Sequence, residues 1–303
     1  MENKKNVIID VDTGIDDAIA LCMSTYSDKL NIKLITTICG NQHIGSVTKN
    51  TLNLLQSINK RRLLVAEGAN KPLSRTRDKS IQAHGKTGLG KYEFPPLELK
   101  PVKEKAVPKM YQILKNAKDK VTIIALGPLT NIARLVKSFP DIIEKIDSIV
   151  ISGGLLHDNP KNHYIGFNIM QDPEAADIVL RCGAKIIIVP SNHGHKAYLT
   201  LREIDIAKKT NNTGNMLSIM FESYKDRHVK KGAATHDPCA AMYVAHPEIF
   251  KTKMMYVHVR YLVEKQTGVL DFDKRKEPNM LVATKINVRK FKKLFFETLK
   301  KMP

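Results

Sequence analysis

Short apolar segments alternate with segments of helical periodicity along most of the chain. The first apolar run, Asn6 to Asp10, is typical of a buried strand; Thr13-Gly14 then indicates a turn, and a helical pattern occupies Asp16 to Tyr26. This order of strand, turn and helix recurs as far as Val189. Such alternation predicts an α/β fold, an open and mostly parallel sheet with helices on both faces.

The remaining predicted elements continue this alternation and then become more helical. Strands are expected at Ile32–Ile38, Val121–Ala125, Ser148–Ser152 and Lys185–Val189, and helices at Ile44–Ile58, Lys103–Lys115, Leu129–Lys137 and Pro173–Arg181. Further helices are expected at Leu201–Thr210, Asn215–Arg227 and Pro238–Ala245, before strands at Met254–Val263 and Leu281–Ile286. Because no linker or repeat interrupts the pattern, residues 1–303 are predicted to form a single domain.

Composition is that of an ordinary globular protein, with 43% hydrophobic and 26% charged residues among 303. The sequence contains no run of about 18 apolar residues, and Met1 to Lys5 leads into a strand rather than a signal peptide. We therefore expect a cytoplasmic protein without a membrane partner. The four cysteines are scattered and form no C-x-x-C pair, which argues against disulfides and a zinc cluster.

The formal net charge of +19 raises the question of nucleic acid binding, because clustered lysines bind phosphates. Most basic residues are spread along the chain, and only residues 285–301 are dense in them. Within this tail, Phe291, Leu294, Phe295 and Leu299 have the spacing of one apolar helix face. We interpret the basic residues as the solvated face of that helix and expect no nucleic acid partner.

Four carboxylates, Asp10, Asp12, Asp16 and Asp17, fall within eight residues where the first strand ends and the first helix begins. Ligands of open α/β sheets bind at this edge. Helix capping and the helix dipole account for some acidic residues here. A hard divalent cation accounts for all four, because Ca²⁺ and Mg²⁺ prefer oxygen ligands and neutralise the repulsion between carboxylates.

The segment beginning at Asp10 also looks like the first motif of Mg²⁺-dependent aspartyl-phosphate phosphatases. In that alternative Asp10 is the nucleophile and Asp12 the acid/base. Those enzymes need a later Gly-Asp motif, and this chain contains no Gly-Asp pair. The phosphatase is therefore the less favoured interpretation of this segment.

A second polar segment, Thr235-His236-Asp237-Pro238, lies near the other end of the chain. Asp237 followed by proline is typical of a helix N-cap with Pro at the first helical position. Hydrolysis at a sugar carbon requires an activated water and help for the leaving group. Asp12 beside a metal is a candidate for the first role and His236 for the second.

Six segments in order resemble the successive motifs of the inosine-uridine preferring nucleoside hydrolase family. They are DVDTGIDDAIAL from Asp10, Gly40-Asn41, HGKTGLG from His84, LGPLTNIA from Leu126, FNIMQDPEAA from Phe167 and HDPCAA from His236. The resemblance spans about 240 residues. It implies a calcium-dependent enzyme that hydrolyses the N-glycosidic bond of ribonucleosides, and assembly into a homodimer or homotetramer.

The resemblance also implies roles for individual residues. Ca²⁺ would be bound by the side chains of Asp12, Asp17 and Asp237 and by the backbone carbonyl of Leu126. Asp12 would take a proton from calcium-bound water, and His236 would protonate the departing base. The ribose hydroxyls would be held by Asp16, Asn41 and Asn168. A lowered pKa of water bound to the metal makes this chemistry feasible.

The glycine-rich segment from His84 resembles a phosphate-binding loop only superficially, because Tyr92 stands where Ser or Thr is required. We interpret it as a mobile active-site loop. His84 is then expected beside the nucleobase, with Tyr224 as a stacking partner. The alternatives are that His84 is an exposed structural residue and that Tyr224 belongs to the core.

The chain departs from the family where the ribose 5′-hydroxyl is normally bound. Gly166 replaces the usual glutamate, and Pro160 replaces an asparagine for which Asn162 or Asn159 would have to substitute. Two alternatives follow: a weaker conventional hydrolase, or an enzyme for a nucleoside altered at the 5′ position, for which Gly166 leaves space. A third is a non-catalytic calcium- or nucleoside-binding protein, against which the retention of Asp12 and His236 argues.

Overall fold

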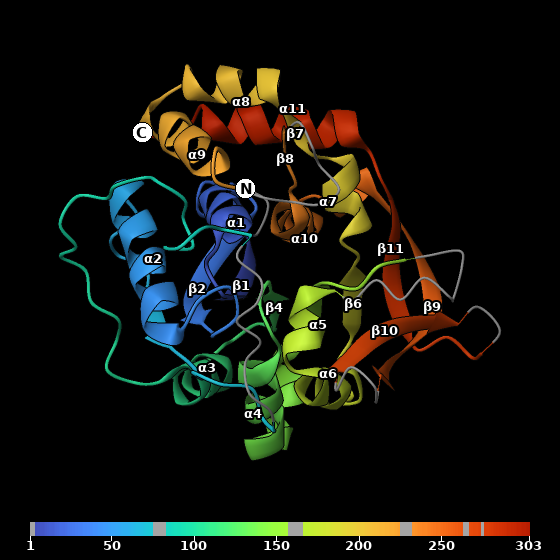
Figure 1. Cartoon of the computed structure of the whole chain (residues 1–303). Helices are drawn as coiled ribbons and strands as arrows, with labels where there is room; N and C mark the ends of the chain where they lie inside the picture. The colour runs from blue at the N-terminus through green and yellow to red at the C-terminus, as the bar shows by residue number, and fades with distance from the viewer. Residues whose placement is uncertain (1–3, 75–82, 157–165, 225–231, 263–266, 274–275) are drawn as a thin grey trace.

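Nine strands form one sheet in the computed structural model, which describes residues 4–74, 83–156, 166–224, 232–262, 267–273 and 276–303 (Figure 1). The strand order is β10-β9-β11-β6-β5-β4-β1-β2-β3. Six neighbouring pairs are parallel, and β9 runs antiparallel to both β11 and β10. The predicted open, mostly parallel sheet is thus confirmed.

The strands of this sheet are β1 (Lys5–Val11), β2 (Leu30–Thr37), β3 (Val65–Glu67), β4 (Val121–Ala125), β5 (Ile146–Ser152), β6 (Ile186–Val189), β9 (Phe250–Leu262), β10 (Thr267–Asp273) and β11 (Met280–Ile286). A separate two-stranded ribbon joins β7 (Leu199–Thr200) to β8 (Gly232–Ala233).

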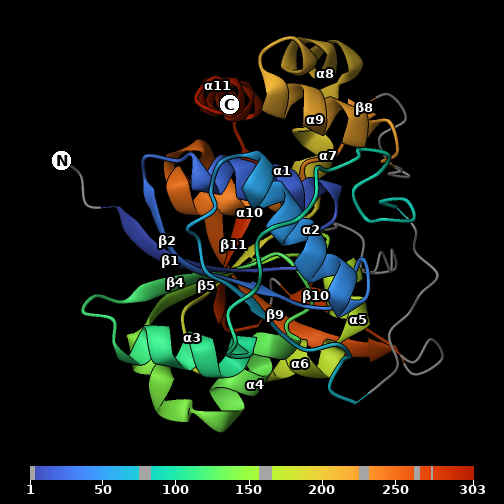
Figure 2. The same ribbon diagram turned by 90° about the vertical axis from the view of Figure 1, so that its left-hand side faces the viewer.

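Helices cover both faces of the sheet, as Figure 2 shows. One face carries α1 (Ile15–Thr25), α2 (Ile44–Ser57), α9 (Asn212–Phe221), α10 (His236–Ala245) and α11 (Val288–Leu299), and the other carries α3 (Ala106–Lys115), α4 (Thr130–Ser138) and α6 (Pro173–Leu180). The side chains of β1 alternate between the two faces of the sheet. Val7 and Ile9 belong to the hydrophobic core under the first group of helices, and Ile8 belongs to the core under the second group. This two-sided burial explains why β1 reads as a continuous apolar run.

Short helices complete the described chain: α5 (Phe167–Gln171), α7 (Asn192–Lys196), α8 (Leu201–Lys208) and the 3₁₀ helices η1 (Pro140–Lys145) and η2 (Pro247–Ile249). Among the described residues, no helix has the length and apolar content needed to cross a membrane. The C-terminal helix is amphipathic as predicted, because Phe291, Phe295 and Leu299 are buried while Lys293 is exposed. One of its cations, Lys292, pairs with Glu203 of α8 at 2.7 Å.

Several predicted helix boundaries are wrong. Helix α9 ends at Phe221 rather than Arg227, which lies outside the described residues, and it begins at Asn212 because Asn211 caps Gly214 N at 2.8 Å. Asp237 is not the N-cap of α10; the helix begins at His236, two residues before the predicted start at Pro238, and its N-cap is Thr235. The carboxylate of Asp237 is consequently in the first turn of the helix and free of a capping role.

Replacing Asp172 with alanine is expected to destabilise the protein by about 1–3 kcal/mol, because three donors would lose their buried acceptor. Its carboxylate accepts from Leu73 N at 2.9 Å, Thr130 Oγ1 at 2.6 Å and Ala175 N at 3.1 Å. Urea unfolding followed by circular dichroism measures the change. Asp177→Ala on the same helix, where the carboxylate is partly exposed, is the control, and equal stability of the two variants would contradict the prediction.

Candidate active site

One pocket opens where the parallel strands end at their carboxyl termini, the edge that the sequence indicates. Nine residues predicted for the site line it: Asp12, Asp16, Asn41, His84, Leu126, Asn168, Tyr224, His236 and Asp237. Asp17, also predicted, is fully buried beside them. Asn162 lies outside the described residues. The pocket also contains Ser152 at the end of β5 and Ser191 in the loop after β6, which the sequence analysis missed although they lie at or just after predicted strands.

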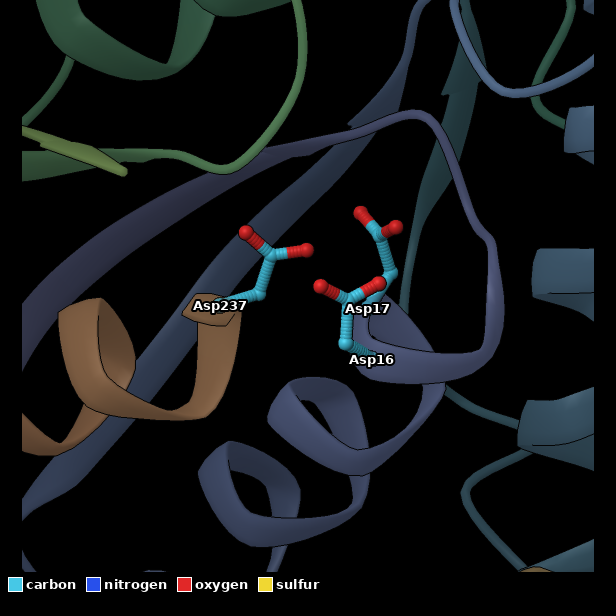
Figure 3. Close-up of side chains that lie close together, drawn as sticks. All are labelled: Asp16, Asp17 and Asp237. Carbon is cyan, nitrogen blue, oxygen red and sulfur yellow. The ribbon is translucent and has the colours of Figure 1, made fainter. Parts of the chain in front are cut away.

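Three carboxylates converge in the pocket from two helix N-termini. Ligand atoms of Asp16, Asp17 and Asp237 all lie within 4.8 Å of one another. Figure 3 shows Asp16 and Asp17 rising from the start of α1 toward Asp237 at the start of α10. The positive ends of both helix dipoles therefore favour negative charge at this point.

Burial and mutual repulsion make the charged state of this cluster costly. Burial, followed by the charge of Asp16, raises the pKa of Asp17 to about 7. The pKa of Asp237 is raised well above its usual value by burial and then by the charges of Asp16, Asp17 and Asp12. A bound divalent cation would neutralise these charges, and an all-oxygen donor set suits a hard cation such as Ca²⁺ or Mg²⁺. The residues present therefore fit a metal.

Asp12 lies next to this cluster, and the backbones of two glycines pack closely against it. A Cβ at Gly40 would lie 2.1 Å from Asp12 Oδ2, and one at Gly127 would lie 3.1 Å from Asp12 Cβ. Asn41 N donates to Asp12 Oδ2 at 2.8 Å. Burial raises the pKa of Asp12, and the charges of Asp17 and Asp16 raise it further. Gly40 and Gly127, in the loops after β2 and β4, thus let the backbone pack against Asp12 where a side chain would collide with it.

Asp10, the remaining acid of the segment from Asp10 to Asp17, lies in the buried interior outside this cluster. Its carboxylate accepts hydrogen bonds from Thr36 and from Asn131 Nδ2, the latter at 2.8 Å. The same Asn131 accepts from Ala69 N at 3.0 Å. Asp10 therefore ties β1 to β2 and to the start of α4, a structural role.

The predicted ribose ligands make contacts that organise the metal candidates. Asn41 Nδ2 donates to Asp17 Oδ2 at 3.1 Å. Asn168 Nδ2 donates to the carbonyl of Leu126, the predicted backbone ligand, and to that of Ser152 at 3.1 Å. Amide groups from the loop after β2 and from α5 are thereby placed directly against the carboxylates and carbonyls of the cluster.

His84 and Tyr224 stack on each other at the pocket, with ring centroids 5.2 Å apart and an interplanar angle of 26°. His84 Nδ1 accepts from Ile15 N at 3.1 Å, which docks its segment on the start of α1. His84 is buried, not an exposed structural histidine, and Tyr224 is only partly buried. The pair offers an aromatic surface suited to a planar ligand.

Gly166 does not leave the space that the sequence suggests. A Cβ at this position would lie 2.7 Å from Gly154 N and 3.2 Å from Gly154 Cα. Gly154 itself has φ of +76°, a conformation that favours glycine. The backbone of residue 154 therefore occupies the volume toward which a side chain at residue 166 would point.

Restoring the glutamate by Gly166→Glu is accordingly expected to destabilise the protein by about 1–3 kcal/mol, the usual cost of overpacking. It should not improve kcat/KM for any ribonucleoside. Thermal unfolding and steady-state kinetics measure both effects. Gly45→Glu is the control, because a Cβ at this helical position would lie 3.5 Å from its nearest neighbouring atom, His43 Nδ1. A Gly166→Glu variant that is as stable as the wild type and more active would contradict both expectations.

Comparison with known proteins identifies relatives over the whole chain. Residues 7–293 match the family described as inosine-uridine preferring nucleoside hydrolase. A non-specific ribonucleoside hydrolase, RihC, from Escherichia fergusonii is 33% identical over 299 residues, which cover 97% of this chain and 98% of the relative. RihC from Escherichia coli O127:H6 is 34% identical over 301 residues, covering 98% and 99%.

Solved structures agree with this match. The plant nucleoside hydrolase PpNRh1 has a TM-score of 0.87 and 29% identity, covering 98% of this chain and 99% of that structure. A purine-preferring ribonucleoside hydrolase from Gardnerella vaginalis has a TM-score of 0.89 and 26% identity, covering 98% of both chains.

Proposed function

Because the chain belongs to the inosine-uridine preferring nucleoside hydrolase family, we propose that it uses Ca²⁺ to hydrolyse ribonucleosides to free base and ribose. The observation that carries the proposal is the convergence of buried carboxylates in a pocket that also contains a histidine and an aromatic pair. Water is the second substrate, and the bond broken is the N-glycosidic bond.

The cation would be held by Asp12, Asp17 and Asp237 and by the carbonyl of Leu126, with Asp16 close enough to contribute. When bound, Ca²⁺ would supply positive charge that lowers the pKa of the attacking water. The rigid packing of Asp12 between Gly40 and Gly127 supports its role as the base, because a fixed carboxylate accepts a proton without reorganisation.

Asp16, Asn41 and Asn168 would bind the ribose hydroxyls, since all three line the pocket around the cluster. Positive charge develops on the sugar as the bond to the base breaks. The surrounding carboxylates stabilise that charge. His236 would donate a proton to the departing base, which the His84–Tyr224 pair would contact on its face.

The test is release of base and ribose from inosine, uridine, cytidine and adenosine, with and without a chelator. We expect release that stops on chelation and returns when Ca²⁺ is added in excess. Release that survives full chelation would overturn the calcium proposal. No release from any of the four, with calcium bound, would overturn the ribonucleoside proposal.

A further inference from the structure

Helix α7 packs its backbone against the imidazole of His236. Its residue Gly194 approaches so closely that a Cβ there would lie 2.3 Å from His236 Nδ1 and 2.6 Å from His236 N. Gly194 does not have a positive φ, so its backbone conformation does not require glycine. The requirement is purely steric: any larger residue must displace either α7 or His236.

The residue before this helix fixes the orientation of the His236 ring. His236 Nδ1 lies 3.1 Å from the carbonyl oxygen of Ser191, the residue before α7. A carbonyl oxygen only accepts, so Nδ1 carries the hydrogen in this contact. In the imidazolium form both nitrogens carry a hydrogen, so Nδ1 would keep its bond to Ser191 while Nε2 gives its proton to the leaving group and His236 becomes neutral.

A second side chain of α7 restrains the ring from the side. The rings of His195 and His236 meet edge to face, with centroids 4.7 Å apart and an interplanar angle of 86°. The carbonyl of Ser191 that accepts from His236 also accepts from His195 N at 3.2 Å. One short helix therefore limits the ring of His236 in position, rotation and protonation pattern.

Backbone contacts join α7 to the residue that precedes His236. Thr235 N donates to Gly194 O at 3.3 Å, and Thr235 Oγ1 donates to Ala197 O at 3.2 Å. Thr235 is fully buried. A shift of α7 would therefore shift the start of α10 with it.

We propose that Gly194 and His195 are positioning residues that hold His236 with Nε2 directed at the nucleobase. This inference rests on the proposed function, in which His236 protonates the leaving group. Neither residue would touch substrate. A loss of the ring contact from His195 should affect mainly leaving groups that need a proton, because that contact reaches the imidazole of His236 and not the carboxylate cluster. A side chain at residue 194 would also press on the backbone of His236, next to Asp237, so the two positions are tested separately.

The experiment compares two ribosides in the calcium-loaded enzyme. Inosine has a leaving group that needs protonation, whereas 4-nitrophenyl β-D-ribofuranoside releases a stable anion that does not. Gly194→Ala is expected to lower kcat for inosine roughly 100-fold, the scale of a lost general acid, with a much smaller change in KM. The fall for the nitrophenyl riboside should be far smaller.

His195 is tested by two substitutions that spare the backbone. His195→Ala is expected to lower kcat for inosine roughly tenfold, a fraction of the general-acid contribution, and His195→Phe to recover most of it by restoring an aromatic edge. Gly45→Ala is the control for a glycine substitution, because its Cβ would meet nothing closer than 3.5 Å. Should Gly194→Ala fail to fold, the two His195 variants decide.

Two results would overturn the positioning role while leaving the proposed function intact. One is a folded Gly194→Ala enzyme with wild-type kcat on inosine, together with unaffected His195→Ala. The other is an equal loss on both ribosides, which would indicate damage to the sugar or metal site. A wild-type enzyme that cleaves neither riboside would instead refute the proposed function itself.

Discussion

Asp12→Asn is expected to lower kcat for inosine by about 10³-fold, within the range for a lost general base, with a much smaller change in KM. The amide keeps the size of the carboxylate and retains an oxygen to accept from Asn41 N, so the fold should persist. It has no useful basicity, so the attacking water would lose its proton acceptor. Initial rates of ribose release at saturating Ca²⁺ measure the effect.

Asp12 is also a proposed metal ligand, so the two roles must be separated. Calorimetric titration with Ca²⁺ gives the affinity of the variant, and activity is then compared at full occupancy. Recovery of wild-type kcat at high Ca²⁺ would show that Asp12 acts as a ligand and not as the base. Asp205→Asn, at an exposed position on α8, is the control for loss of one acidic charge.

The central elements of the fold were predictable because each is bounded by clear signals. Strand β4 was predicted with its observed bounds, since its four apolar residues and Thr122 form a short run that is buried on both faces of a parallel sheet. Strand β10 was missed, because TGVLDFD has little alternation and forms by pairing antiparallel to β9 at the sheet edge. Helix α5 has only five residues, too few for a periodic pattern.

The sequence predicted which residues belong to the site better than it predicted how they are arranged in space. Acidic residues at a strand end indicated a cation, and the family resemblance supplied the roles. Neither gave the observed trio, in which Asp16 joins Asp17 and Asp237 and Asp12 lies beside them. The role of α7 was also invisible, because the contact of Gly194 with His236 joins residues 42 positions apart through the packing of two helices.

Asp237→Asn is expected to raise the thermal midpoint of the metal-free protein at mildly alkaline pH. Burial and then the charges of Asp16 and Asp17 raise the pKa of Asp237, so its ionised form disfavours the folded state. A carboxyl group with a raised folded-state pKa costs stability increasingly as pH rises, and the neutral amide removes that cost. At saturating Ca²⁺ the variant should lose this advantage over the wild type, because the cation neutralises the cluster in the wild-type protein.

The same substitution should remove the stabilisation that Ca²⁺ gives. A ligand present at 100 times its Kd stabilises the folded protein by about 2.7 kcal/mol, so added Ca²⁺ should raise the wild-type midpoint and leave that of Asp237→Asn almost unchanged. Differential scanning calorimetry with and without Ca²⁺ measures all four midpoints, and Asp177→Asn on α6 is the control. If Asp237→Asn lowered the metal-free midpoint while calcium still stabilised it, repulsion within the cluster would not be what the cation relieves, and Asp237 would act through its hydrogen bonds instead.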